Sequence, residues 1–181
     1  MSIFTIVIIA IIVYFIVIYN KFVSLNASID SAWSDIDVQL KRRHNLIPSL
    51  INVVKGYKDY EKSALESVIK ARQLGMESTG VKDKEKAENM LTNALGKIFA
   101  LAEAYPDLKA NETFIKLQVE LSAIEEAIQN ARRYYNAIVR DFNAKIDTFP
   151  DLLIAKKFNF TKKDYFEIED KRVREMPDTN I

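Results

Sequence analysis

Residues 3–19 read IFTIVIIAIIVYFIVIY, and this stretch decides how the rest of the chain can fold. It contains no charged residue, no glycine and no proline. A helix formed by it would extend roughly 26 Å at about 1.5 Å per residue, against the ~30 Å of hydrocarbon in a bilayer. We therefore predict a membrane-spanning helix, with Tyr14, Tyr19 and Lys21 completing the crossing at the interface.

Two other interpretations of this stretch compete with a membrane span. A cleaved secretory signal would have a basic segment before the apolar core and small residues after it, whereas Met1 and Ser2 come before and Tyr-Asn-Lys-Phe comes after. A core helix of a soluble protein normally carries polar residues on one face, and here Thr5 is the only one. The chain also has no cysteine for a lipid-modified anchor. These features favour an uncleaved span.

The distribution of basic residues predicts the orientation of the span. No Lys or Arg precedes the apolar stretch, whereas Lys21 follows at once and Lys41, Arg42 and Arg43 come later. Because basic residues favour the cytoplasmic side, we expect a single-pass protein of the cell membrane with its N-terminus outside and its remaining residues in the cytoplasm.

Composition favours a helical domain after the anchor. The 181 residues include four glycines and four prolines, which is few for a turn-rich β fold. A net charge of +1 gives no argument for nucleic acid as a partner. We expect an all-α chain with a transmembrane anchor at residues 1–20, a helical bundle domain at 21–155 and a C-terminal tail at 156–181.

Apolar residues at steps of three and four predict an antiparallel bundle of about four long helices. The anchor should continue into a first cytosolic helix, as one rod, with a kink or break near residues 45–47 caused by Pro48. A second helix over residues 50–74 should end at Gly75, with a loop over 75–81. A third helix should run from about Lys82 to Tyr105.

The fourth predicted helix is the most regular. Asn111 is a suitable N-cap, and the helix should stop at Phe149 before Pro150. Its apolar residues form a heptad seam, namely Phe114, Leu117, Leu121, Ile124, Ile128, Ala131, Tyr135, Ile138 and Phe142. A short helix over residues 151–155 and aromatic residues folded back onto the bundle should follow. The segment from about Lys171 is expected to be mobile.

The candidate residues for chemistry point to a structural role. His44 lies in a basic run and is expected to be a surface residue, because the sequence specifies no carboxylate or nucleophile for it. Di-iron bundles use Glu-x-x-His pairs, and no histidine lies three residues after a glutamate here. Residues 132–136 (RRYYN) are expected to bond across to neighbouring helices. Trp33 is expected to pack in the core or to cover the membrane-proximal end of the bundle. We predict no catalytic, cofactor-binding or metal-binding residues.

Several motifs resemble signatures of the LemA family. Residues 37–43 (DVQLKRR) with Leu46-Ile47-Pro48 resemble the first signature, and residues 103–111 (EAYPDLKAN) resemble the second. Further matches, in family order, are Leu117-Gln118, Glu120-Leu121, Ala131-Arg132, Tyr135-Asn136 and Phe149-Pro150. The resemblance implies a bacterial membrane-anchored helical bundle without established enzymatic activity. It also implies a link to cell-envelope processes and a possible partner in a membrane metallopeptidase of the HtpX type.

The sequence thus favours a membrane-anchored scaffold or adaptor that binds protein partners near the membrane. The alternative is a lipid-binding or oligomerising protein that remodels membranes, with Lys41 and Arg42 pressed onto anionic lipid. A straight helix would place these residues about 30 Å beyond Tyr19, which favours contact with solvent or a partner over contact with lipid. An enzyme would require side chains to converge in a pocket, which no motif here predicts.

Overall fold

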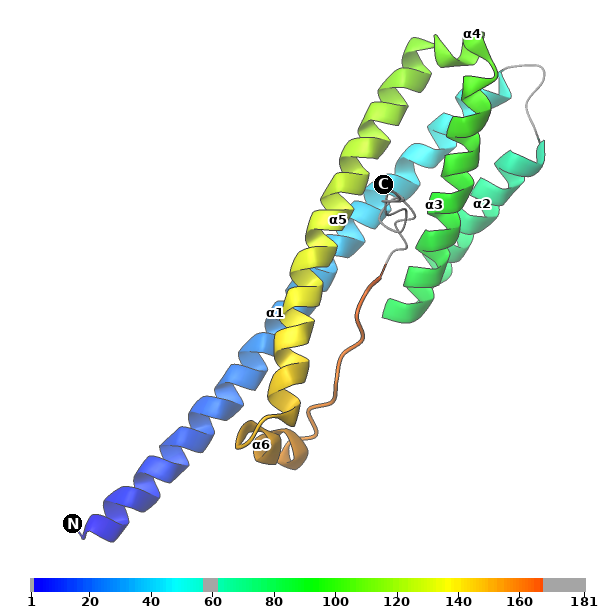
Figure 1. Cartoon of the computed structure of the whole chain (residues 1–181). Helices are drawn as coiled ribbons and strands as arrows, with labels where there is room; N and C mark the ends of the chain where they lie inside the picture. Colours follow the sequence, from blue (N-terminus) through cyan, green and yellow to red (C-terminus); the bar gives the residue numbers. More distant parts are fainter. Residues whose placement is uncertain (1, 57–61, 168–181) are drawn as a thin grey trace, which may run out of the picture. The chain divides into compact units, whose positions relative to one another are not determined.

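Where the structure describes the chain, all regular secondary structure is helical. The computed structural model describes residues 2–56 and 62–167 (Figure 1). Its helices are α1 (Ile3–Lys55), α2 (Lys62–Glu77), α3 (Val81–Glu103), α4 (Pro106–Lys109), α5 (Glu112–Asp147) and α6 (Asp151–Lys157). The predicted all-α class with a long apolar N-terminal helix is therefore confirmed. The tail beyond Lys171 lies outside the described residues.

Packing divides the described residues into two units, and each has its own interior. Unit 1 holds residues 2–40 and 126–165, and unit 2 holds residues 41–56, 62–125 and 166–167. Helices α1 and α5 each contribute one end to each unit. The domain boundaries predicted at residues 20 and 155 describe the anchor and the tail, and they stay a prediction.

Helix α1 continues through Pro48, so of the kink or break expected near residues 45–47 the break is excluded. Proline has no N–H, and the carbonyl oxygen four residues earlier, on His44, therefore loses its helical donor. The side chain of Arg72 on α2 replaces that donor, because its Nε atom donates to the His44 carbonyl oxygen at 2.8 Å. The hydrogen bond that Pro48 removes from the helix is thus restored from a neighbouring helix.

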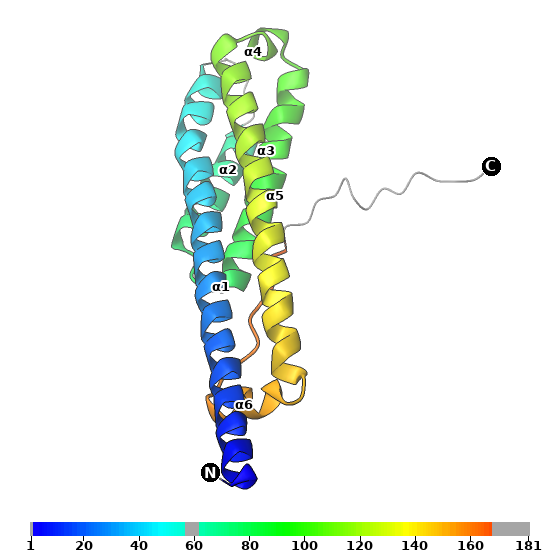
Figure 2. The same ribbon diagram turned by 90° about the vertical axis from the view of Figure 1, so that its left-hand side faces the viewer.

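The helix expected over residues 50–74 is in fact the end of α1 followed by α2. Helix α1 ends at Lys55 beside Gly56, a residue that weakens helices, and α2 begins at Lys62. Gly75 was expected to cap the second helix, but it lies inside α2 and is buried. The chain turns only after Glu77, and α2 packs against α3 as a helical hairpin (Figure 2).

Helix α5 begins and packs as its sequence predicts. The side-chain oxygen of Asn111 accepts a hydrogen bond from the backbone N–H of Phe114 at 3.0 Å, which confirms the N-cap. Most of the predicted seam is buried, and Ala131 and Ile138 are partly buried. Its buried members are Phe114, Leu117, Leu121, Ile124, Ile128, Tyr135 and Phe142.

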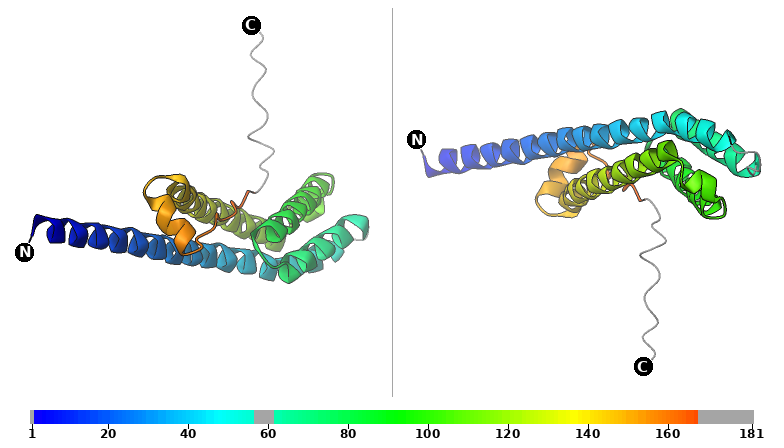
Figure 3. Two further views of the ribbon diagram at one scale, coloured as in Figure 1. Left: turned by 90° about the horizontal axis from the view of Figure 1, so that it is seen from below. Right: turned by 90° about the horizontal axis from the view of Figure 1, so that it is seen from above.

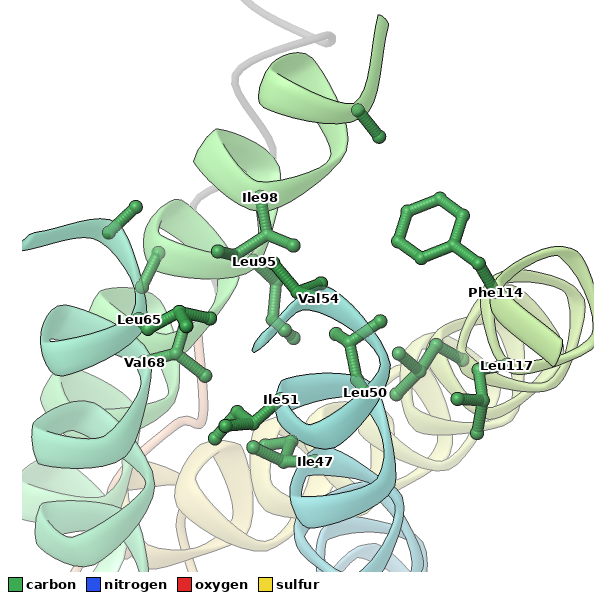
Figure 4. Packing of buried hydrophobic residues seen from close by; sticks show 14 of the residues in the cluster. Ile47, Leu50, Ile51, Val54, Leu65, Val68, Leu95, Ile98, Phe114 and Leu117 are labelled. Atoms are coloured by element: carbon green, nitrogen blue, oxygen red, sulfur yellow. The ribbon is translucent and has the colours of Figure 1, made fainter. Parts of the chain in front are cut away.

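The interior of unit 2 is mainly aliphatic. Five helices contribute to it: the end of α1, both helices of the hairpin, α4 through Leu108, and the beginning of α5. Part of this cluster is drawn in Figure 4. The labelled side chains are Ile47, Leu50, Ile51, Val54, Leu65, Val68, Leu95, Ile98, Phe114 and Leu117. Burial of such side chains stabilises the helices by about 25 cal/mol per Å² of apolar surface.

The interior of unit 1 combines aliphatic side chains with a cluster of aromatic rings. The Phe22 ring is fully buried and stacks on Phe160 with centroids 4.9 Å apart, while Phe142 meets Phe22 edge-on at 5.7 Å. Residues 158–165 run back from α6 past this cluster as an extended segment, drawn in orange (Figure 1). Helix α6 crosses beside α1 and the end of α5 (Figure 3). The predicted return of the tail aromatics is confirmed for Phe160 in unit 1 and for Phe166, which is buried and belongs to unit 2.

Candidate functional site: a buried ion cluster and an exposed apolar segment

Unit 2 contains a cluster of charged side chains within its interior. Arg43 and His44 from α1 are buried, and Glu88 from α3 has no exposed surface at all. Glu125 from α5 and Thr92 from α3 complete the cluster. Because ionised groups lose their hydration on burial, they are tolerated only when they are paired and hydrogen-bonded.

Glu88 is the centre of the cluster and receives two partners from α1. Its Oε1 lies 2.7 Å from His44 Nε2, and its Oε2 lies 3.4 Å from Arg43 Nη1. Arg43 Nη2 also donates to Thr92 Oγ1 at 2.8 Å and lies 3.1 Å from Glu125 Oε2. One guanidinium thus bridges two carboxylates from two different helices.

Gly75 makes room for this cluster. A Cβ atom at position 75 would lie 2.8 Å from Glu88 Oε1 and 2.9 Å from His44 Nε2, which is too close for either side chain. Glycine therefore allows α2 to approach the His44–Glu88 pair directly. Its role is close packing, and the expectation that it terminates the helix is wrong because the helix continues to Glu77.

The expectation that His44 is a surface residue is also wrong. Lys41 and Arg42 are exposed, but Arg43 and His44 lie on the buried side of α1. The signal was present in the spacing, since both residues fall between the buried Leu40 and Ile47 at helical steps of three and four.

The burial of Glu88 was likewise not predicted from the sequence. Glu88 lies one helical turn before Leu91 and two turns before Leu95, on the apolar seam of α3. A charged residue at such a seam position predicts a buried partner of opposite charge. The carboxylate and the two α1 side chains could have been matched on this basis.

The polar groups in the cluster form hydrogen bonds and ion pairs with one another. Within the described residues, no buried side-chain nitrogen or oxygen lacks a hydrogen-bond partner. The same residues contain no group of three or more His, Asp or Glu side chains placed to hold a metal ion. The arrangement can therefore fix the register of α1, α2, α3 and α5 in unit 2, and its polar atoms are occupied in doing so.

The cluster predicted over residues 132–136 is divided in the structure. Tyr135 is buried, packs on Trp33 at 5.5 Å, and donates its hydroxyl to the Asp164 carbonyl oxygen at 2.9 Å. Burial, with the nearby carboxylates of Asp164 and Asp30, raises the pKa of the Tyr135 hydroxyl to about 12. Tyr134, by contrast, is exposed. The polar bond that Tyr135 makes is to the returning tail, whereas a bond to a neighbouring helix was expected.

The apolar segment of α1 is exposed over most of its length. Residues 3–14 are all exposed, and burial begins only near Ile18. This exposure argues against the alternative that the segment is the core helix of a soluble protein. In water, its apolar side chains would be in contact with solvent. In the described part of the chain, α1 is the one helix long and apolar enough to cross a membrane.

Comparison with known proteins connects these features to a family. A sequence model described as LemA family matches residues 32–180. Magnetosome protein MamQ 2 of Paramagnetospirillum magneticum is 25% identical over 175 residues, covering 82% of this chain and 64% of that protein. Protein LemA of Metamycoplasma hominis is 28% identical over 144 residues, covering 77% of this chain and 64% of that protein.

A further relative, Magnetosome protein MamQ of Magnetospirillum gryphiswaldense, is 24% identical over 174 residues, covering 82% of this chain and 64% of that protein. In each comparison the chain matches less than two thirds of the relative's length. The family match extends over most of the chain and includes all of α2 to α6 as well as the buried cluster. On this evidence, the chain belongs to the LemA family.

Proposed function

We propose that the protein is a single-span membrane scaffold of the bacterial cell envelope, which holds a helical docking surface next to the bilayer. The observation that carries this proposal is the double role of α1. Its first residues are apolar and exposed, while residues 47–54 of the same helix form part of the unit 2 core. An anchor and a packed domain therefore share one helix.

Docking rather than catalysis is supported by how the buried polar groups are used. The one histidine of the chain, His44, and the fully buried carboxylate of Glu88 are of the residue types used in acid–base catalysis, and they bind each other inside unit 2. A catalytic group must instead reach a substrate. Unit 2 meanwhile exposes large apolar side chains, namely Ile69, Met76, Met90, Ile115 and Val119. Exposed apolar side chains are candidate contacts for a protein partner, and methionine in particular is enriched at protein interfaces.

A membrane metallopeptidase of the HtpX type is the partner we would test first, on the family resemblance. A photoreactive amino acid placed at Val119 or Met76 of the full-length chain should crosslink to one membrane protein in intact cells. The same probe at Lys86, an exposed polar position of unit 2, serves as the matched control. Adducts from Val119 that an antibody identifies as the metallopeptidase, with none from Lys86, would support the proposal.

The absence of a protein adduct from every unit 2 position, in a chain shown to be in the membrane, would overturn the scaffold role. The predicted orientation has its own test, because the chain lacks cysteine. Single cysteines at Ser2 and Val119 should differ in intact cells. An impermeant maleimide should label Ser2→Cys and leave Val119→Cys unlabelled until the membrane is opened. The reverse pattern would place the bundle outside.

A further inference from the structure

One corner of unit 1 presents aromatic, aliphatic and basic side chains together to solvent. Phe149 is 75% exposed, Leu153 is 49% exposed and Phe158 is 50% exposed. Lys156 and Lys157 are exposed beside them. We name these five residues the α6 corner; it comprises three large exposed apolar side chains and two exposed lysines.

The packing of α6 forces these residues outward. Asp151, Ile154 and Ala155 are the buried residues of the helix. Asp151 is held by an ion pair with Lys145 of α5. Leu153 lies four residues before Lys157 within α6, so helical spacing places these two exposed side chains on one side of the helix.

The α6 corner lies at the same level of unit 1 as the end of the apolar segment of α1. The Phe158 ring packs on Tyr19, with centroids 4.6 Å apart. Asn159 then adopts a left-handed conformation with a φ of 57°, which turns the chain so that Phe160 stacks on Phe22. Tyr19 is the last residue of the apolar stretch, and Phe158 is therefore held where that stretch ends.

We propose that the α6 corner lies in the headgroup layer of an anionic bilayer, with its apolar side chains at the hydrocarbon boundary and its lysines on lipid phosphates. This proposal rests on the proposed membrane span of residues 3–19. That span is slightly shorter than the hydrocarbon layer, at roughly 26 Å against ~30 Å. The boundary therefore falls close to Tyr19 and to the Phe158 ring that packs on it.

The side-chain chemistry favours lipid over a protein partner at this corner. Aromatic rings gather at membrane–water interfaces, and lysines beside them extend toward phosphates. Lys21, which is exposed, adds a basic residue just after Tyr19 on α1. A basic cluster at this end of unit 1 is attracted to an anionic lipid surface. A second copy of the chain would instead have to accommodate the same positive charge against itself.

Spin labels on single cysteines test the depth of the corner directly. The full-length chain is reconstituted in vesicles of phosphatidylcholine and phosphatidylglycerol, with a label at Leu153, Ile11 or Val119. Ile11 belongs to the apolar segment, whereas Val119 is an exposed apolar residue of unit 2 and is 63% exposed. Accessibility to oxygen, which concentrates in lipid, is compared with accessibility to a polar nickel complex in water.

We expect the oxygen-to-nickel ratio to be highest at Ile11, intermediate at Leu153 and several-fold lower at Val119. In the Lys156→Glu/Lys157→Glu background, the ratio at Leu153 should fall toward that at Val119, while the ratio at Ile11 should not change. An aqueous label at Ile11 would overturn the membrane span itself. A label that is deep at Ile11 but aqueous at Leu153 would overturn the α6 corner alone.

Protection by another copy of the chain gives a different result. A Leu153 label shielded from both oxygen and nickel, with shielding that increases with the protein-to-lipid ratio, would overturn the lipid assignment in favour of self-association. Replacing phosphatidylglycerol with phosphatidylcholine separates the contribution of the apolar side chains from that of the two lysines. The ratio at Leu153 should fall on this replacement, and an unchanged ratio would overturn the role of the two lysines.

Discussion

The two units of this chain both have largely aliphatic interiors, but each contains a different additional cluster of side chains. Unit 1 packs the rings of Phe22, Phe142 and Phe160 against one another and leaves apolar side chains exposed at both α1 and α6. Unit 2 packs aliphatic side chains and encloses paired charges around Glu88. Both units expose apolar side chains, so what distinguishes unit 2 is the charge enclosed around Glu88, which selects one arrangement of its helices.

Buried charged groups favour one arrangement of the helices, because the free-energy cost of burying a charge depends on whether its partner is in place. Apolar residues tolerate a range of neighbours, but an ionised group that loses its partner inside a protein is strongly destabilising. Arg43 meets carboxylates from α3 and α5 only in one register of the helices. We infer that unit 2 is the part of the chain with the more exacting geometry, and the following measurements test that inference.

The largest effect is expected for Glu88→Ala. The substitution leaves His44 and Arg43 buried without their shared carboxylate, and loss of one partner of a buried pair costs about 3–5 kcal/mol. Urea unfolding of the full chain in detergent, followed by circular dichroism, should show this loss. Glu120→Ala, at an exposed position of α5, should change the free energy of unfolding by less than about 0.5 kcal/mol. Equal effects of the two substitutions would contradict a structural role for the cluster.

The next effect concerns Arg72, whose side chain replaces the hydrogen bond lost at Pro48. Arg72→Met should leave the His44 carbonyl oxygen unsatisfied at a cost of about 1–3 kcal/mol. In the Pro48→Ala background the helix regains its own donor, and Arg72→Met should then cost less. A double-mutant cycle on unfolding free energies measures this coupling. Additive effects would show that Arg72 acts independently of the proline.

Alanine substitutions at two glycines should change the free energy of unfolding in opposite directions. Gly75→Ala should destabilise by about 1–3 kcal/mol, because the added methyl group meets Glu88 and His44. Gly96→Ala on α3 meets nothing within 4 Å and should stabilise by about 0.5–1 kcal/mol through helix propensity. Thermal unfolding of the two variants against the unchanged chain decides the matter. A stabilising Gly75→Ala would refute the close approach of α2.

The smallest effect is expected in unit 1, for Tyr135→Phe. Loss of the hydroxyl bond to Asp164 should cost about 0.5–1.5 kcal/mol near neutral pH. The unfolded tyrosine ionises near its ordinary pKa of 10.0, but burial raises the pKa of the folded residue to about 12. The stabilisation from Tyr135 should therefore be complete below pH 10 and decline as the pH rises to 12. The difference in unfolding free energy between the two proteins, measured at both pH values, should shrink.

Apolar periodicity was sufficient to predict most of the helices but not where the chain turns. The seam of α5 and its Asn111 cap could be predicted because local spacing and a single capping bond determine them. The passage of α1 through Pro48 could not, since it depends on Arg72, which lies in a different helix. Gly75 was expected to end its helix. The structural reason for a glycine here is the His44–Glu88 pair, which comes from two other helices and is not evident from the local sequence.

The candidate site was predictable only in part for the same reason. The exposed apolar segment is a property of consecutive residues and was evident from composition. The buried cluster joins residues from α1, α3 and α5, and its ion pairs form only once these helices have packed. Spacing alone marked Arg43, His44 and Glu88 as charges on apolar seams. The identity of their partners required the structure.

Because Arg72 donates a hydrogen bond to the His44 carbonyl oxygen, the order in which Arg72 and Pro48 are replaced during evolution should matter. If Arg72 were replaced first, the His44 carbonyl oxygen would have no hydrogen-bond donor, whereas replacing Pro48 first would restore the helical donor. The arginine could then drift freely, because the helix would already hold its own bond. Mutational paths through this pair should therefore be traversed one way more easily than the other, and a library varied at both positions would recover arginine mainly alongside proline.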